Sequence, residues 1–282
     1  MKRSTLRGFL GYSKERLSDI PFLIISILYL GFCLFSSVRW MIGGIAGHVI
    51  LSSGFLLFIP AMLAVEYLFG MRFGPIFMVA ALSIAVGAIL GSPFGMYSAL
   101  PMFDDILHTL SGFVFAALGL SLAEFFFGRA RGGRKFAGSL VFAAAFSLGL
   151  AVLWELWEFG GMLLLGMETA DDTLIDGFTS FFFTSRSEAV VLDGITKTVI
   201  YYGDGLSLTV DGYLDIGYFD TLNDMIVCTI GTVAFTAFAL VGRLKLPWLE
   251  RALVPSVRTE GEREDASEKT AEDTCTEGLS EE

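Results

Sequence analysis

Residues 136–161 read FAGSLVFAAAFSLGLAVLWELWEFGG, an apolar run that is long enough to cross a lipid bilayer as one helix. A helix needs about 20 predominantly apolar residues to span the hydrocarbon core. Five further runs of this kind occur in the chain. Together the six runs predict an all-α polytopic membrane protein with a six-helix transmembrane bundle. The other five runs lie at about 20–38, 44–68, 73–97, 105–127 and 220–242.

The composition agrees with a membrane protein rather than a soluble one. Hydrophobic residues make up 54% of the chain, charged residues only 17%, and the mean hydropathy is +0.66. The net charge of -11 arises mainly in residues 249–282, which hold 11 of the 30 acids. The three cysteines form no CxxC or Cys/His spacing, which argues against a zinc-thiolate site or a disulfide scaffold. We expect the lipid bilayer as a partner and no nucleic acid.

The distribution of Lys and Arg predicts the orientation, because these residues concentrate on the cytoplasmic side of membrane proteins. With both termini in the cytoplasm, 16 of the 19 Lys and Arg residues fall inside. The protein is therefore expected in the cell membrane with an N-in/C-in topology. Pro75 lies near the start of the third run, where proline is tolerated, whereas Pro60 should kink the second.

The chain divides into three segments on this topology. A segment of about 162–219 lies outside between the fifth and sixth runs, and it contains Lys197–Tyr202 and Leu206–Val210 around Gly-Asp-Gly. This alternation of β-branched and aromatic residues predicts a small β-hairpin. The segments are a basic cytoplasmic stretch (1–19), the transmembrane domain (20–242) with its external insertion, and an acidic, disordered cytoplasmic tail (249–282).

Three polar motifs stand at helix ends that this topology places at the outer face. They are Asp104–His108 at the start of the fourth run, Trp154–Glu158 at the end of the fifth and Asp220–Asp224 at the start of the sixth. Residues three or four apart share one face of a helix. We expect six side chains to converge, with Asp105, Asn223 and His48 as further candidates. The six are Asp104, His108, Glu155, Glu158, Asp220 and Asp224.

The charges in these motifs point to a bound cation. The outer half-helices contain no Lys or Arg, so bound cations, shared protons or water must balance the carboxylates. Carboxylates with one imidazole suit a divalent Mn, Mg, Fe or Zn ion. Acids at a helix N-terminus can instead act as caps. That alternative does not apply to Glu155 and Glu158, which stand near the C-terminal end of their helix.

The same motifs resemble the YjdF-type family of bacterial inner-membrane proteins. The shared pattern is an Asp four before a His, a Gly four after it, a Glu-x-x-Glu with neighbouring aromatics, an acidic stretch and Asp-Thr-x-x-Asp-Met. Ser111 and Leu222 depart from it, since each stands where a Gln is expected. The resemblance implies the helix layout and the motif set, without a reaction. The matching residues are Asp104, His108, Gly112, Glu155, Glu158, Ala170–Asp172, Asp220-Thr221 and Asp224-Met225.

Three functions are compatible with such a site. The first is a metal-dependent membrane enzyme that activates water against a lipid-linked or extracytoplasmic small substrate. The second is a cation- or proton-coupled transporter, which should carry polar residues through the membrane. The run Phe113–Leu120 is apolar, and this favours a one-sided site. The third is a non-catalytic membrane scaffold or sensor.

Overall fold

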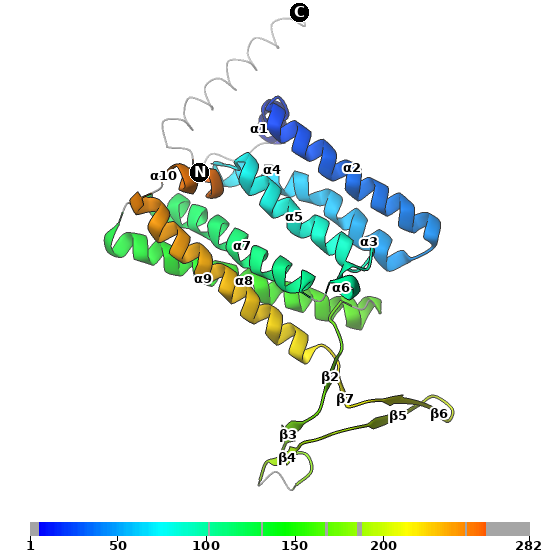
Figure 1. Cartoon of the computed structure of the whole chain (residues 1–282). Coiled ribbons are helices and arrows are strands. Elements are labelled where there is room, and N and C mark those ends of the chain that lie inside the picture. The colour runs from blue at the N-terminus through cyan, green and yellow to red at the C-terminus, as the bar shows by residue number, and fades with distance from the viewer. Residues whose placement is uncertain are drawn as a thin grey trace, which may run out of the picture. The chain divides into compact units, whose positions relative to one another are not determined.

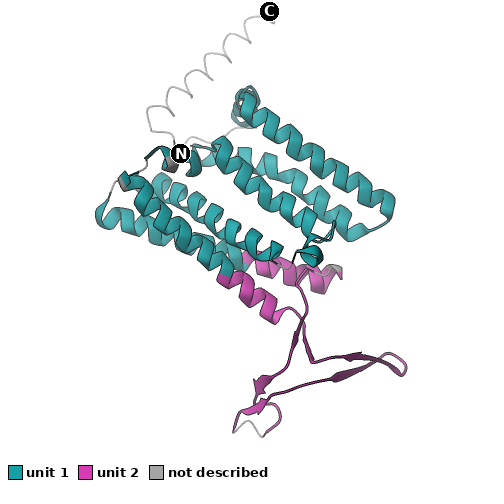
Figure 2. Cartoon of the chain, in the orientation of Figure 1, with its two compact units in different colours: residues 1–152, 227–282 teal, residues 153–226 magenta. Residues whose placement is uncertain are grey.

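A computed structural model describes residues 6–100, 102–130, 132–166, 169–184, 188–245 and 247–257 (Figure 1). The chain forms two compact units (Figure 2). Unit 1 comprises residues 1–152 and 227–282, and unit 2 comprises residues 153–226. Helices α8 (Gly133–Leu165) and α9 (Tyr218–Lys245) are each continuous and contribute residues to both units.

The described residues include five helical stretches that are long and apolar enough to cross a membrane. Each coincides with one of the six predicted runs, which confirms the all-α polytopic class. Their lengths of 24 to 32 residues exceed the roughly 20 residues that a bilayer core requires. They are Ile20–Gly43 (α2), Ala46–Phe69 (α3 to α4), Phe103–Phe127 (α7), Gly133–Leu164 in α8 and Tyr218–Arg243 in α9.

The third predicted run, 73–97, forms a shorter helix than expected. Helix α5 spans Pro75–Gly91, only 17 residues, and a single turn, α6 (Met96–Ala99), follows it. Pro93 explains the early end, because proline lacks an N–H and disfavours helical backbone in the residue before it. Gly95 then reverses the chain with a φ of +76°. Six helices of spanning length were predicted, whereas the described residues contain five and one shorter apolar helix.

The second run contains a 3-10 turn shortly before Pro60, and the kink predicted at this proline stays a prediction. Helix α3 (Ala46–Gly54) passes through a 3-10 turn, η1 (Phe55–Leu57), into α4 (Phe58–Phe69). Proline removes one backbone donor from the helix, which favours such a local adjustment of the hydrogen-bond ladder. The hydroxyl of Tyr29 donates to the carbonyl oxygen of Phe55 at 2.9 Å and satisfies an acceptor at this break.

Within unit 1, α7 and α9 approach each other closely at two glycines. A side chain at Gly112 would overlap with the carbonyl oxygen of Cys228, and one at Gly231 would overlap with that of Thr109. Small residues at helix interfaces in membranes allow this approach, because van der Waals contact replaces hydrophobic burial as the driving force. The close packing of α7 against α9 thus explains why a glycine occupies position 112 of the Asp104–His108–Gly112 pattern.

A buried hydrogen-bond node joins α8 to this pair of helices. The Ser147 hydroxyl donates to the carbonyl oxygen of Gly112 at 2.9 Å and lies 2.8 Å from the Thr232 hydroxyl. Ser147 is fully buried and Thr232 nearly so. In lipid, such polar contacts between helices replace bonds that water would otherwise make. The node therefore holds α7, α8 and α9 in one register.

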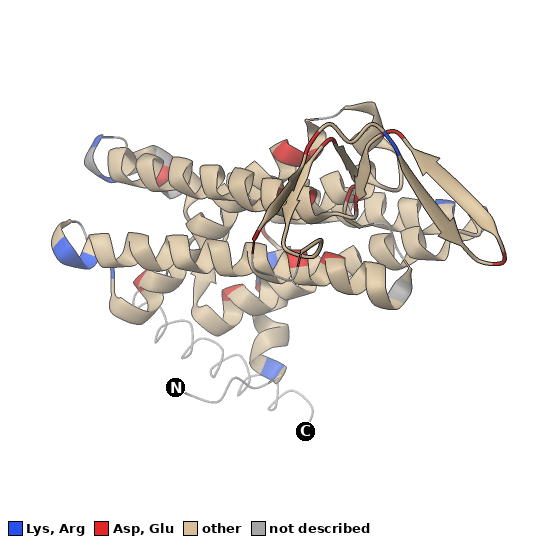
Figure 3. Cartoon of the chain, turned by 90° about the horizontal axis from the view of Figure 1, so that it is seen from below, with Lys and Arg blue, Asp and Glu red and all other residues tan. Residues whose placement is uncertain are grey.

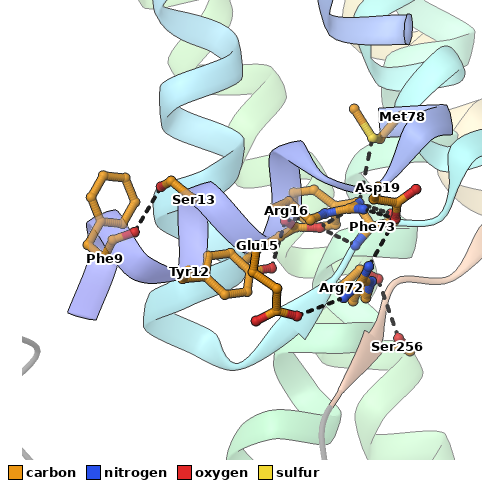
Figure 4. A network of polar contacts seen from close by, with 11 residues as sticks. Phe9, Tyr12, Ser13, Glu15, Arg16, Asp19, Arg72, Phe73, Met78 and Ser256 are labelled. Carbon is orange, nitrogen blue, oxygen red and sulfur yellow. Dashed lines mark hydrogen bonds and ion pairs between the residues drawn. The ribbon is translucent and has the colours of Figure 1, made fainter. Parts of the chain in front are cut away.

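The N-terminal helix α1 (Leu6–Leu17) is attached to the bundle by a buried ion pair. Arg16 bonds to both carboxylate oxygens of Glu66, at 3.0 and 3.2 Å, and its side chain is 2% exposed. The same guanidinium donates to the carbonyl oxygen of Phe73 at 2.6 Å and to Asp19 at 2.5 Å (Figure 4). Burial would raise the pKa of the Asp19 carboxyl, but hydrogen bonding to Arg72 and the charge of Arg16 lower it below its usual value.

The C-terminal segment is also folded onto unit 1 as far as residue 257. Helix α10 (Pro247–Leu253) places the buried Glu250 against Arg243, which also binds Glu124 at 2.5 Å. Strand β8 (Ser256–Val257) then pairs antiparallel with β1 (Met71–Arg72). The prediction of a disordered tail from residue 249 is therefore wrong for 249–257, because Glu250 completes a buried ion-pair network. Residues 258–282 lie outside the described residues.

Unit 2 contains the insertion between α8 and α9, which forms three two-stranded antiparallel ribbons. The predicted hairpin is confirmed, because β5 and β6 pair from Thr198↔Val210 to Tyr202↔Leu206. Gly203 and Gly205 in its turn adopt positive φ angles of 53° and 86°. The pairs are β2 (Thr173–Ile175) with β7 (Tyr213–Asp215), β3 (Phe178–Ser180) with β4 (Val190–Leu192), and β5 (Thr198–Tyr202) with β6 (Leu206–Val210).

Candidate functional site

Three carboxylates come together within unit 2, where α8 ends and α9 begins. Glu155, Glu158 and Asp224 each offer one oxygen, and these oxygens all lie within 4.8 Å of one another. The two glutamates are partly exposed, whereas Asp224 is 1% exposed. We call these three residues the carboxylate group. Its members come from two of the three motifs that the sequence singles out.

Helix α8 positions the two glutamates on one face, because they are three residues apart. The indole Nε1 of Trp154 donates to Glu158 Oε1 at 2.7 Å and orients that carboxylate. The hydroxyl of Thr169 donates to the backbone carbonyl of Glu158 at 2.5 Å, so the chain after α8 folds back onto its last turns. The sequence could have indicated the contact of Trp154, because this residue stands four positions before Glu158 on the same helix. No pattern in the sequence indicates the contact of Thr169, which follows after the end of the helix.

Helix α9 holds Asp224 in its second turn, and the start of this helix is capped. The backbone N–H of Phe219 donates to Asp215 Oδ2 at 2.8 Å, which satisfies one of the donors that every helix start leaves over. Asp220 makes a hydrogen bond within unit 2, and its predicted role as a ligand stays a prediction. It accepts the backbone N–H of Asp171 at 2.8 Å and thereby ties the acidic stretch 170–172 to the first turn of α9.

Asp104 and His108 lie in unit 1. They lie one turn apart on α7, with His108 Nε2 3.6 Å from Asp104 Oδ1, and both are half-buried. His48 is elsewhere in unit 1, with its ring 4.6 Å from that of Trp40 in an edge-to-face contact. Asp105 and Asn223 lie on α7 and α9 beside the predicted ligands. The convergence of all six predicted residues stays a prediction.

The electrostatics of unit 2 favour cations. Residues 153–226 contain 13 Asp and Glu but only two Lys and Arg. Figure 3 shows acidic positions along the loops of the insertion. Carboxylates that are held close together raise one another's pKa unless a cation or shared proton offsets the repulsion. A cluster of this kind therefore attracts metal ions and protons and repels anions.

The carboxylate group has the chemistry of a site for a hard divalent cation. Mg²⁺ and Ca²⁺ take oxygen ligands, and carboxylates also suit Mn²⁺. Three oxygens from three side chains, within 4.8 Å of one another, can contact one ion. The indole bond to Glu158 acts as an outer-shell contact that fixes a ligand oxygen. The same group could also hold a shared proton.

Comparison with known proteins gives one family. A family model described as "Predicted membrane protein (DUF2238)" matches residues 22–244. This range includes four of the five stretches of spanning length completely and the first from residue 22, together with the insertion and every predicted ligand. Searches among curated proteins and among solved structures found no match.

Proposed function

Because the chain belongs to the DUF2238 family of predicted membrane proteins, we propose that it is an integral membrane protein that binds a divalent cation. Glu155, Glu158 and Asp224 would hold the ion. The observation that carries this proposal is the meeting of three carboxylate oxygens within 4.8 Å on two helices. The YjdF-type motifs include all three residues. A cation offsets a cluster of charges that would otherwise be unfavourable near a membrane.

We extend the site by proposing that Asp104 and His108 contribute further ligands. The spacing of the two residues supports this idea. They lie one turn apart on α7, with His108 Nε2 3.6 Å from Asp104 Oδ1, so both side chains can face one ion. A carboxylate and an imidazole would then complete a mixed ligand set.

We propose that the bound ion serves a one-sided reaction, as in a metal-dependent membrane enzyme. A divalent ion supplies Lewis acidity and a nucleophilic water at neutral pH, which suits hydrolysis of a lipid-linked or extracytoplasmic small substrate. The aromatic contacts deeper along these helices support this over transport. Phe113 packs against Phe235 and Phe238 at ring distances of 5.2 and 5.7 Å. A transporter would need a continuous polar path across the membrane, whereas the polar groups at this level, Ser147 and Thr232, are buried and bonded to each other.

Metal titration tests the proposal. The purified protein in detergent is expected to bind Mn²⁺, and the double variant Glu155→Gln/Glu158→Gln is expected to lose this binding. Asp224→Asn should raise the Kd at least about tenfold, because loss of an outer-shell contact alone costs about 10–100-fold in affinity. Calorimetry and the electron paramagnetic resonance signal of free Mn²⁺ measure both effects.

The control is Glu188→Gln, which removes an exposed acid of the insertion that is remote in sequence from the carboxylate group. This variant should bind Mn²⁺ like the parent protein. His108→Ala separates the two parts of the proposal, since weaker binding is expected only if the imidazole is a ligand. Unchanged Mn²⁺ affinity in the double glutamine variant would show that the carboxylate group is no metal site.

We also propose residence in the cell membrane with both termini in the cytoplasm. The support is the segregation of 16 of the 19 Lys and Arg residues to one side. In a Cys275→Ser background, a membrane-impermeant maleimide should label Ile200→Cys in intact cells and Asp265→Cys only after lysis. Labelling of both positions from the same side would exclude this topology.

A further inference from the structure

The ribbon β3–β4 ends in three exposed phenylalanines. Phe181, Phe182 and Phe183 are 54%, 82% and 58% exposed. No charged residue occurs between Gly177 and Ser185, although unit 2 as a whole is strongly acidic. Large apolar groups that gather at an uncharged surface mark a place where something other than water binds. We call Phe181–Phe183 the aromatic tip.

Ring contacts hold the aromatic tip outward. Phe183 packs against Phe178 at 6.3 Å and against Phe182 at 5.8 Å, and Phe178 in turn lies 4.7 Å from Tyr213 on β7. A two-stranded ribbon has no second layer that could bury such rings. The tip is therefore an ordered apolar projection, which loses little conformational entropy when it binds.

The attachment of the insertion to two helices of spanning length points to the lipid bilayer as the occupant. The helical ends in this unit belong to stretches of spanning length, and exposed apolar side chains occupy them as well. Both ends of the insertion are thus attached at the membrane surface, which keeps lipid at a high effective concentration near the tip. The exposed side chains at these helix ends are Trp157, Phe159, Leu163, Leu164, Tyr218 and Phe219.

Charge argues against a second copy of the chain at this position. With 13 acids and two basic residues, residues 153–226 of two copies would repel each other. We propose that the aromatic tip inserts into the headgroup–acyl boundary of the leaflet where α8 ends and α9 begins. Apolar side chains of peripheral elements reach about 5–10 Å into this region. The tip would hold the insertion down on the bilayer next to the carboxylate group.

A nitroxide label at Phe182→Cys tests the proposal in the full-length protein, reconstituted in phosphatidylcholine vesicles. Cys275 is replaced by Ser, whereas Cys33 and Cys228 are retained because they are buried. Power saturation should show that the label loses access to water-soluble nickel chelate and gains access to oxygen. The aqueous reference is Asp204→Cys in the β5–β6 turn, and the lipid reference is Ile230→Cys, which is exposed on α9.

The proposal would be overturned if the label at position 182 were as accessible to the nickel chelate as the label at position 204. Spin–spin broadening between labels, which marks a second copy, would overturn it too, and so would low access to both reagents, which marks a protein-lined pocket. Phe183→Cys gives an independent reading if the first variant does not fold. Mn²⁺ binding should stay unchanged in both variants, so this test does not depend on the proposed metal site.

Discussion

Gly112→Ala is expected to destabilise the protein by about 1–3 kcal/mol or more, because overpacking of a tight contact forces the backbone to shift. The added methyl group would overlap with the carbonyl oxygen of Cys228 on α9. Backbone cannot move aside as a flexible side chain can, so α7 and α9 must separate. Gly231→Ala should have a similar effect, since its methyl group meets the carbonyl oxygen of Thr109. Thermal unfolding in detergent measures the loss.

The matched control is Gly149→Ala on α8, where an added methyl group meets nothing within 4 Å. Alanine favours a helix over glycine by about 1 kcal/mol, so this variant should be neutral or more stable. The same Gly→Ala change is thus expected to lower the stability at Gly112 and to leave it unchanged or raise it at Gly149. Equal stability of the Gly112 and Gly149 variants would contradict the close approach of α7 and α9. A weaker Mn²⁺ affinity in Gly112→Ala is a second expected readout, because the crossing sets the register of these helices.

Glu66→Ala is expected to destabilise the protein by about 3–5 kcal/mol, the usual effect of removing one partner of a buried ion pair. Glu66 is fully buried and accepts bonds from Tyr12 at 2.9 Å, from Arg16 and from the backbone N–H of Phe73 at 2.5 Å. Its removal leaves the guanidinium of Arg16 buried with part of its charge uncompensated. Unfolding monitored by circular dichroism should report the change, together with faster proteolysis of the N-terminal helix.

Two controls define the origin of this effect. Glu15→Ala removes an exposed acid of α1, the helix that carries Arg16. Its carboxylate lies 3.8 Å from Arg72, and its removal should change the free energy of unfolding by less than about 1 kcal/mol. Arg16→Leu/Glu66→Leu replaces both charges by apolar groups and should be milder than Glu66→Ala. If the double variant is as unstable as the single one, the loss comes from the other bonds of Glu66 rather than from an uncompensated charge.

The sequence predicted the candidate site in part. Glu155 and Glu158 share a helix face by spacing, and the topology argument places Asp224 at the same depth, so their meeting follows from simple rules. The hydrogen bond of Asp220 did not follow, because its partner is a backbone N–H that lies 49 positions earlier in the chain. The folded C-terminal segment was missed for the same reason. Glu250 belongs to an ion-pair network with Arg243 and Glu124, and these partners are brought together only by the tertiary structure.

The sequence by itself determined that this is a helical membrane protein, with its long apolar helices, the irregular helix near Pro60 and the β5–β6 hairpin. These features depend on interactions between neighbours in the chain, namely apolar length, missing proline donors and glycine turns. Only the tertiary structure decided which polar side chains meet. Arg16 with Glu66, Ser147 with Thr232, and Glu155 with Asp224 are each separated by 50 residues or more. Such pairs depend on where helices cross, and glycines such as Gly112 set those crossings through contacts that a linear pattern does not contain.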